Sequence, residues 1–196
     1  MAEKVGFENG DGILTTGGSN GNMIGLLMAR QRYDPNSLQN GSDGRQLVVF
    51  CSEETHYSIS MAANVLGLGH KNVIKVKVDA DGRIDPSELA VKVKEAKDEG
   101  KHPFCVVGTA GSVVRGAYDP LRELAAICKE HKMWFHIDAA WGGGCLLSDN
   151  HRYLMDGAHL ADSLCWDAHK MMGVPLICSA FITTDLALLK EVCSHT

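Results

Sequence analysis

The feature that most constrains the fold of this chain is an alternation of short apolar runs with stretches of helical periodicity. The apolar runs lie at residues 47–51, 73–78, 104–109, 134–138, 163–166 and 177–183. Helical patterns lie at 22–33, at 56–67, after Asp85-Pro86, after Asp119-Pro120 and after Asp185. Continuously apolar strands are buried on both faces, and strands that alternate with helices pair in parallel. The sequence therefore predicts an α/β fold with a mostly parallel sheet sandwiched by helices.

One helix start is unusually well marked. Asp85 is in the N-cap position, Pro86 follows at the first helical position, and Glu88 is at the third. Leu89, Val93 and Ala96 then recur at helical spacing and predict one buried face.

Two stretches lack such a pattern. Residues 35–45 are polar and rich in Asn, Ser and Gly, which predicts an exposed, flexible loop. Residues 8–12 also look like a loop, and the last helix has no clear end signal. No composition shift marks a second domain. We therefore expect one domain that is a piece of a larger protein.

Composition excludes several function classes. The 196 residues are 45% hydrophobic and 22% charged, as in soluble globular proteins, and the net charge of −5 argues against a nucleic-acid surface. The sequence contains no run of 18 apolar residues, so no membrane span is predicted. The N-terminus lacks the apolar core of a signal peptide. Seven scattered cysteines without a CxxC motif indicate a reducing, cytoplasmic location. Nine histidines show no metal-binding spacing, so no metal site is expected.

The most informative motif is Asp167-Ala168-His169-Lys170, directly after the apolar run at 163–166. A lysine among apolar neighbours is costly if it stays charged and unpaired. Desolvation lowers the pKa of such an amine and makes it a nucleophile. The alternative is a surface lysine on a turn.

Other candidates lie at predicted strand ends or helix starts, where ligands of parallel sheets gather. Glycines in the stretch 16–21 allow a backbone to approach a phosphate at a helix start, although a plain glycine-rich turn has the same sequence. Asp138 ends an apolar strand and suits a buried cation such as a pyridinium nitrogen, or else a cap or structural hydrogen bond. His56 could stack on a flat ring or cap a helix. Thr109 could donate a hydrogen bond to a ligand or belong to a turn.

A phosphate loop, a ring-stacking imidazole, a strand-end aspartate and a nucleophilic lysine are the four contacts that pyridoxal 5'-phosphate needs. The chain resembles the pyridoxal-phosphate-dependent group II amino-acid decarboxylases, most closely the glutamate and cysteine-sulfinate decarboxylase branch. The resemblance rests on the stretches 6–19, 52–59, 109–112, 116–120, 136–144 and 169–174.

The resemblance implies a role for each candidate. Lys170 would bond covalently to the cofactor, His56 would stack on its ring, and Asp138 would pair with the ring nitrogen. The remaining expected cofactor contacts are Gly17, Gly18, Ser19, Thr109, Ala140, Asp167 and His169. Asp167-Ala168 stands where the family often has Asn-Pro, so a carboxylate takes the place of a neutral group near the phosphate. Ser112-Val113 replaces a common Thr-Thr pair.

The resemblance also implies an architecture and a reaction. Residues 1–196 would be the central part of the large domain of a fold-type-I (aspartate aminotransferase-like) enzyme, without its N-terminal segment and small C-terminal domain. The full enzyme would be a homodimer that decarboxylates an acidic amino acid (glutamate, aspartate or cysteine sulfinate) to the amine and CO2. The alternatives are another fold-type-I lyase and a truncated, catalytically silent fragment.

Overall fold

Strand β2 (Leu47–Ser52) shows why this chain forms a sheet covered on both faces. Val48 and Phe50 point into one buried apolar cluster, and Leu47, Val49 and Cys51 point into a second cluster on the opposite side. Every residue of the strand is buried. Successive side chains of a strand point to opposite faces, so a continuous apolar run requires helices on both.

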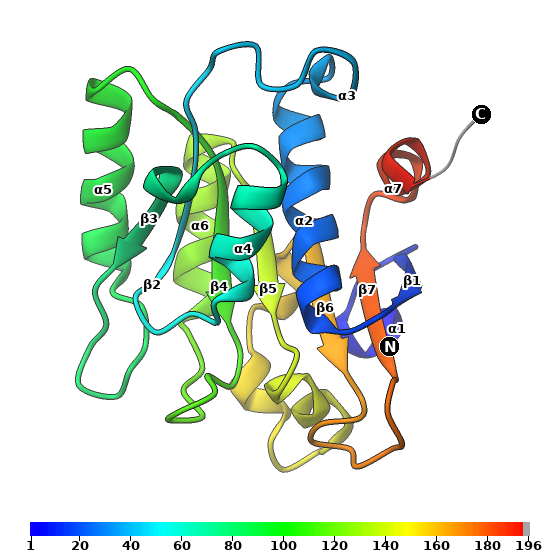
Figure 1. Ribbon diagram of the computed structural model, residues 1–196. Helices are drawn as coiled ribbons and strands as arrows, with labels where there is room; N and C mark the ends of the chain where they lie inside the picture. The colour runs from blue at the N-terminus through cyan, green and yellow to red at the C-terminus, as the bar shows by residue number, and fades with distance from the viewer. Residues whose placement is uncertain (194–196) are drawn as a thin grey trace.

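The computed structural model describes residues 1–193, which form a single seven-stranded sheet (Figure 1). The other strands are β1 (Asp11–Thr15), β3 (Val73–Val76), β4 (His102–Thr109), β5 (Trp134–Asp138), β6 (Ser163–Asp167) and β7 (Ser179–Thr183). Their spatial order is β1-β7-β6-β5-β4-β2-β3. Strands β3, β2, β4, β5 and β6 pair in parallel, whereas β7 runs antiparallel to both β6 and β1. The predicted mostly parallel sheet is confirmed.

Helices cover both faces of the sheet. Residues of α2 (Gly18–Tyr33), α4 (Ser58–Val65) and α7 (Leu186–Cys193) join the cluster on one face. Residues of α1 (Ala2–Val5), α5 (Pro86–Asp98) and α6 (Leu121–His131) belong to or adjoin the cluster on the other. The remaining helical segments are α3 (Ser37–Asn40), η1 (His70–Asn72), η2 (Gly142–Leu147), η3 (Arg152–Met155) and η4 (Ala158–Leu160). No helix in the described part of the chain is long and apolar enough to span a membrane.

The predicted start of α5 is confirmed. The Asp85 carboxylate accepts hydrogen bonds from the backbone N–H groups of Ser87 and Glu88, at 2.8 and 3.3 Å. Leu89, Val93 and Ala96 are buried against the sheet, as their spacing predicted.

Two predicted loops are wrong in part. Strand β1 begins at Asp11, because an edge strand can be held by backbone pairing with β7 without an apolar run. The stretch 35–45 contains α3, and its buried Ser37 donates a hydrogen bond to the Gln31 side chain. This stretch is therefore anchored to α2 rather than freely exposed.

Several boundaries also differ. Helix α2 begins at Gly18 rather than at residue 22, and α4 spans Ser58–Val65 rather than 56–67. Strand β7 begins at Ser179 rather than at 177, since Ile177 is 63% exposed and does not join the sheet.

Candidate active site

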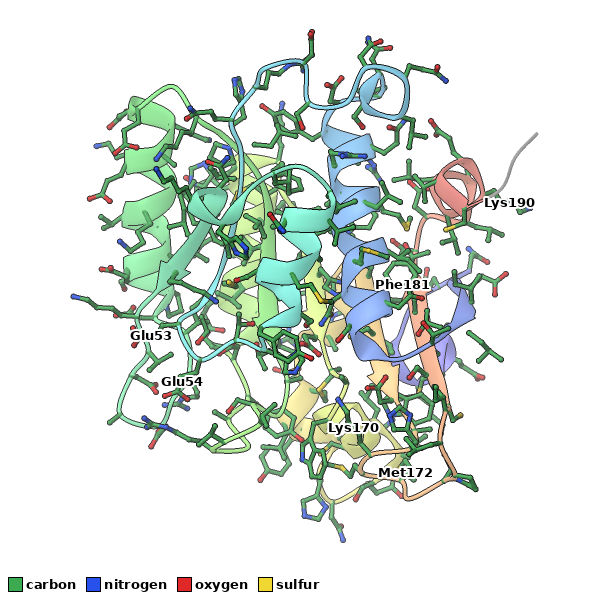
Figure 2. All side chains as sticks on the ribbon, in the orientation of Figure 1. Glu53, Glu54, Lys170, Met172, Phe181 and Lys190 are labelled. Atoms are coloured by element: carbon green, nitrogen blue, oxygen red, sulfur yellow. The ribbon has the colours of Figure 1, made fainter. Side chains whose placement is uncertain are left out.

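A cavity of about 260 Å³ lies where β4, β5 and β6 end and α2 begins. All ten residues that the sequence predicted for the site line this cavity: Gly17, Gly18, Ser19, His56, Thr109, Asp138, Ala140, Asp167, His169 and Lys170. They come from segments far apart in the chain, and parallel pairing brings those segments to one edge of the sheet. Figure 2 shows Lys170 at that edge, beyond the lower end of β6.

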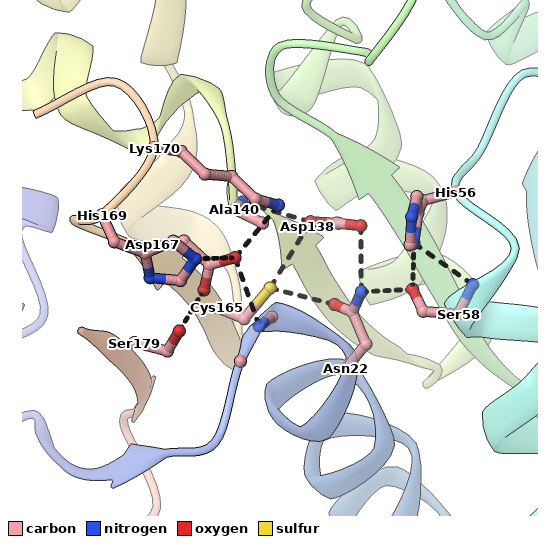
Figure 3. Close-up of polar contacts among 12 residues, drawn as sticks. Asn22, His56, Ser58, Asp138, Ala140, Cys165, Asp167, His169, Lys170 and Ser179 are labelled. Atoms are coloured by element: carbon pink, nitrogen blue, oxygen red, sulfur yellow. Dashed lines mark hydrogen bonds and ion pairs between the residues drawn. The ribbon is translucent and has the colours of Figure 1, made fainter. Parts of the chain in front are cut away.

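Asp138 ends β5 and is only 6% exposed. Its carboxylate accepts hydrogen bonds from the Asn22 amide at 2.9 Å and from the Ala140 backbone N–H at 3.1 Å (Figure 3). The Cys165 thiol lies 3.4 Å from the same carboxylate. All three donors are neutral, so the carboxylate is oriented without being neutralised.

His56 is half-buried, two residues before α4 begins. Its Nδ1 lies 2.9 Å from the Ser58 hydroxyl and 3.3 Å from the Ser58 backbone N–H. The imidazole therefore lines the cavity with one nitrogen already engaged by α4.

Lys170 corrects one part of the sequence argument. The expectation that apolar neighbours surround its amine is wrong: the side chain is 35% exposed, and Nζ lies 3.0 Å from the Asp167 carboxylate. The residue sits on a turn in which its backbone N–H bonds to the Asp167 carbonyl. The turn alternative thus describes its backbone, but the amine still lines the cavity. The amine therefore faces a carboxylate rather than an apolar surface.

The glycines at the start of α2 meet a specific steric need. Gly17 has a φ of +136°, a conformation that residues with a Cβ rarely adopt. A Cβ on Gly18 would lie 2.8 Å from the Asp167 carboxylate and 2.9 Å from the Ala140 Cβ. Only a glycine at position 18 allows the helix start to approach these two side chains.

Asp167, whose role the sequence left undefined, is 1% exposed and has four partners, of which His169 Nε2 is the most distant at 3.9 Å. Its carboxylate accepts from the Gly18 backbone N–H at 3.2 Å and from the Ser179 hydroxyl at 2.6 Å, and it pairs with Lys170. It therefore joins the start of α2, strand β7 and Lys170.

His169 and Thr109 make mainly structural contacts. His169 Nδ1 lies within 3.2 Å of the backbone of Cys178, which ties the turn after β6 to the residue before β7. The Thr109 hydroxyl lies 3.4 Å from the Thr55 hydroxyl. The backbone N–H of Thr109 donates to the buried Asp119 carboxylate. Burial raises the pKa of Asp119 to about 6.

Sequence reasoning missed Asn22, Ser58 and Cys165. Asn22 is 1% exposed in the first turns of α2, yet its amide contacts Asp138 and Ser58, which come from β5 and α4. The sequence did contain a signal for Asn22: it is a polar residue on the face of the helix that is buried. A buried polar group needs hydrogen-bond partners.

Other parts of the described chain offer weaker candidates. A cavity of about 700 Å³ beside α6 contains none of the predicted residues. Two of its cations are already paired, Arg32 with Asp185 and Arg122 with Asp156. Among the described residues, no group of three His, Cys, Asp or Glu side chains could hold a metal ion.

Comparison with known proteins identifies the family of the chain. Residues 1–195 match the family described as the pyridoxal-dependent decarboxylase conserved domain. The chain is 44% identical over 194 residues to acidic amino acid decarboxylase GADL1 of Bos taurus, covering 98% of this chain and 37% of that protein. It thus spans a little over a third of that relative's length.

Solved structures agree in fold. The crystal structure of mouse CSAD in apo form is 42% identical with a TM-score of 0.96, covering 100% of this chain and 41% of that one. The glutamate decarboxylase domain of a Vibrio parahaemolyticus diaminobutyrate enzyme is 33% identical with a TM-score of 0.90, covering 98% of this chain and 44% of that one.

Proposed function

The chain belongs to the pyridoxal-dependent decarboxylase family, and on that premise we propose that the protein containing it decarboxylates an acidic amino acid to the amine and CO2. The similarity to a relative named acidic amino acid decarboxylase supports the substrate class. Glutamate, aspartate and cysteine sulfinate are the candidate substrates, and pyridoxal 5'-phosphate is the proposed cofactor.

One observation carries the proposal: Lys170 and Asp138 line the same cavity from different strands. Lys170 follows β6, Asp138 ends β5, and His56 enters from the start of α4. An amine, a buried carboxylate and an imidazole are thus available to one ligand.

These residues fit pyridoxal phosphate. Asp138 is a buried carboxylate whose hydrogen-bond partners are neutral, which suits a protonated ring nitrogen. Lys170 offers an amine to the aldehyde, and His56 would cover one face of the ring. Gly17, Gly18 and Ser19 would face the phosphate at the start of α2. When bound, the cofactor supplies a ring that accepts the electron pair left on the substrate carbon as CO2 departs.

The remaining chemistry falls to the side chains. Asp138 would hold a proton on the ring nitrogen, which favours negative charge in the ring during the reaction. Asp167, 3.0 Å from Lys170 Nζ, is placed to receive a proton when that amine must become a nucleophile. Ala140 would pack beside the ring, while Thr109 and His169 would complete the wall of the site.

Further parts of the proposal concern the whole protein. We place the chain in the central part of the large, cofactor-binding domain, since it covers about two fifths of the CSAD structure. A homodimer is proposed because apolar side chains around the cavity are exposed, including Tyr57 (68%), Val113 (73%) and Val114 (89%). A cytoplasmic location is proposed because all seven cysteines are free.

The test uses the full-length protein that contains this chain. Purified with pyridoxal phosphate, it should show a visible absorbance band and release CO2 and amine from at least one of the three acids. Absence of the band would reject the cofactor assignment. A band with an aldehyde as product would favour another fold-type-I lyase, and a band without any turnover would favour a silent chain.

A further inference from the structure

Beneath the cavity, buried polar groups form a continuous chain from β5 to α4, and Figure 3 shows the part of it that joins Asp138, Asn22, Ser58 and His56. Trp134 Nε1 donates to the Ser163 hydroxyl at 2.8 Å, and that hydroxyl lies 2.8 Å from His136 Nδ1. His136 Nε2 lies 2.9 Å from Asn22 Oδ1. The Asn22 amide nitrogen then donates to Asp138 and to the Ser58 hydroxyl, each at 2.9 Å.

The first half of this chain has only one consistent arrangement of hydrogens. An indole N–H can only donate, so the Ser163 oxygen accepts from Trp134 and its own hydrogen is available to His136 Nδ1. Burial lowers the pKa of His136 to about 4, so the ring is neutral near pH 7. The Asp138 carboxylate needs the Asn22 nitrogen to face it, so Asn22 Oδ1 faces His136 Nε2. The single proton of the neutral ring is therefore on Nε2, and Nδ1 accepts from Ser163.

The other contacts of the Asn22 amide agree with this orientation. Its oxygen accepts from His136 and also lies 3.0 Å from the Cys165 thiol. Its nitrogen must then face Asp138 and Ser58, which uses both amide hydrogens. A flipped amide would place its oxygen 2.9 Å from a carboxylate oxygen, where two acceptors repel.

The last link reaches His56. The Ser58 oxygen accepts from Asn22, and its own hydrogen is available to His56 Nδ1, 2.9 Å away. The Ser58 backbone N–H donates to the same nitrogen at 3.3 Å. Nδ1 of a neutral His56 is thus an acceptor, and its proton lies on Nε2.

The contact between α2 and β5 is shaped around this network. Gly25 lies in the interior of α2, where glycine weakens a helix. A Cβ at that position would lie 2.7 Å from His136 Nδ1. The glycine therefore allows the helix to pack close enough for Asn22 to bridge β5 and α4.

We propose that Asn22 is a positioning residue for the proposed decarboxylation: it orients the Asp138 carboxylate toward the cofactor ring nitrogen and, through Ser58, holds the His56 proton on Nε2. It acts on both groups at once, although it need not touch the substrate. This inference rests on the proposed function, because it assigns Asp138 and His56 a common ligand.

The experiment compares Asn22→Ala and Asn22→Asp with Asn64→Ala, an exposed asparagine on α4, in the full-length protein with pyridoxal phosphate. The readouts are the pH at which the bound-cofactor absorbance changes, the ¹⁵N shifts of the His56 ring, and kcat. Asn22→Ala should still bind cofactor through Lys170. It should shift the spectral transition, give a mixture of His56 tautomers and lower kcat about ten- to a hundred-fold.

Asn22→Asp separates positioning from filling space. It preserves the side-chain volume but places a second carboxylate 2.9 Å from Asp138, so its spectral shift should exceed that of Asn22→Ala. If Asn22 only filled space, Asn22→Ala should give the larger spectral shift of the two variants. Asn64→Ala should match the parent in all three readouts.

Failure of the inference and failure of the proposed function look different. If the parent protein binds no pyridoxal phosphate, the proposed function fails before any variant is made. If the parent binds it, but Asn22→Ala shows unchanged spectral pH dependence and unchanged His56 shifts, the inference is overturned. Should the Asn22 variants not fold, Ser58→Ala removes the hydroxyl that links Asn22 to His56 and leaves the contact between Asn22 and Asp138. It should alter the His56 shifts while leaving the cofactor spectrum unchanged, and unaltered shifts would overturn the inference.

Discussion

Two buried aspartates line the cavity and differ in their partners: Asp138, at the proposed nitrogen end, and Asp167, at the proposed phosphate end. Asp138 is 6% exposed and receives hydrogen bonds from neutral groups, with no lysine or arginine of the described chain paired to it. Asp167 is 1% exposed, but Lys170 lies 3.0 Å away and a helix start donates to it. Because a buried charge needs compensation, Asp138 is arranged for an external cation, whereas Asp167 is compensated internally.

This difference has a consequence for ligand binding. A cationic ring nitrogen, as proposed, would complete the environment of Asp138. A phosphate brought to the start of α2 meets a carboxylate already bonded to Gly18. The nitrogen end of the cavity is thus complementary to the proposed cofactor in charge, while the phosphate end contains a competing negative charge.

The largest expected effect comes from the amine that joins the two ends. Lys170→Ala should abolish turnover, since no other residue of the site offers an amine to the aldehyde. Borohydride reduction followed by peptide mass spectrometry should find the cofactor mass on the peptide containing Lys170 in the parent and not in the variant. Lys129→Ala, on the exposed face of α6, is the matched control. Cofactor trapped on a different lysine would contradict the assignment.

The second effect tests the nitrogen end. Asp138→Asn should lower kcat by roughly two to three orders of magnitude while cofactor still binds, because the negative charge facing the ring nitrogen is lost. Steady-state kinetics with a cofactor-binding titration checks both parts. Activity equal to that of the parent would mean that Asp138 does not face the ring nitrogen.

A third prediction concerns stability and the network around Asp138. Burial lowers the pKa of His136 from 6.5 to about 4, so between these values the unfolded chain binds a proton that the folded chain does not. The contribution of His136 to the free energy of unfolding has its full value above about pH 6.5 and declines as the pH falls toward 4. The loss at pH 5 should be about 2 kcal/mol.

Urea unfolding at pH 7 and pH 5 measures this loss. Asp119, whose pKa is raised to about 6, works in the opposite direction, because its folded form gains a proton as the pH falls. The informative quantity is therefore the difference in pH dependence between the parent and His136→Gln, not the stability of either one. Identical pH dependence would show that His136 does not carry the predicted shift.

The strands of the sheet show how far the sequence could predict the fold. Strands such as 47–51 and 134–138 were found within a residue, because burial on both faces leaves an unbroken apolar run. Strand β1 was missed because backbone pairing with β7 holds it, and its outer residues are exposed. The pattern reports burial, so it finds strands with buried side chains, edge strand β3 included, and misses β1, whose side chains are mostly exposed.

In the site, the residues at strand ends were predictable because parallel topology forces those ends together. The neighbours of Lys170 were not, since Met171 and Met172 beside it in sequence are exposed and its partner is Asp167 across a turn. Asn22 and Ser58 were missed for a related reason. Their partners lie on other segments, and residue spacing within one segment carries no information about them.

The smallest expected effect tests the phosphate end and so the comparison itself. Asp167→Asn keeps an acceptor for Gly18 and Ser179 but removes the charge, and should raise affinity for pyridoxal phosphate roughly ten-fold. The variant also frees Lys170 from its ion pair, which affects any aldehyde equally. The ratio of affinities for pyridoxal phosphate and for unphosphorylated pyridoxal isolates the phosphate, with exposed Asp149→Asn as control. A ratio that falls would mean that the Asp167 carboxylate shares a proton with the phosphate and binds it, and the two ends would then be alike in complementing the cofactor.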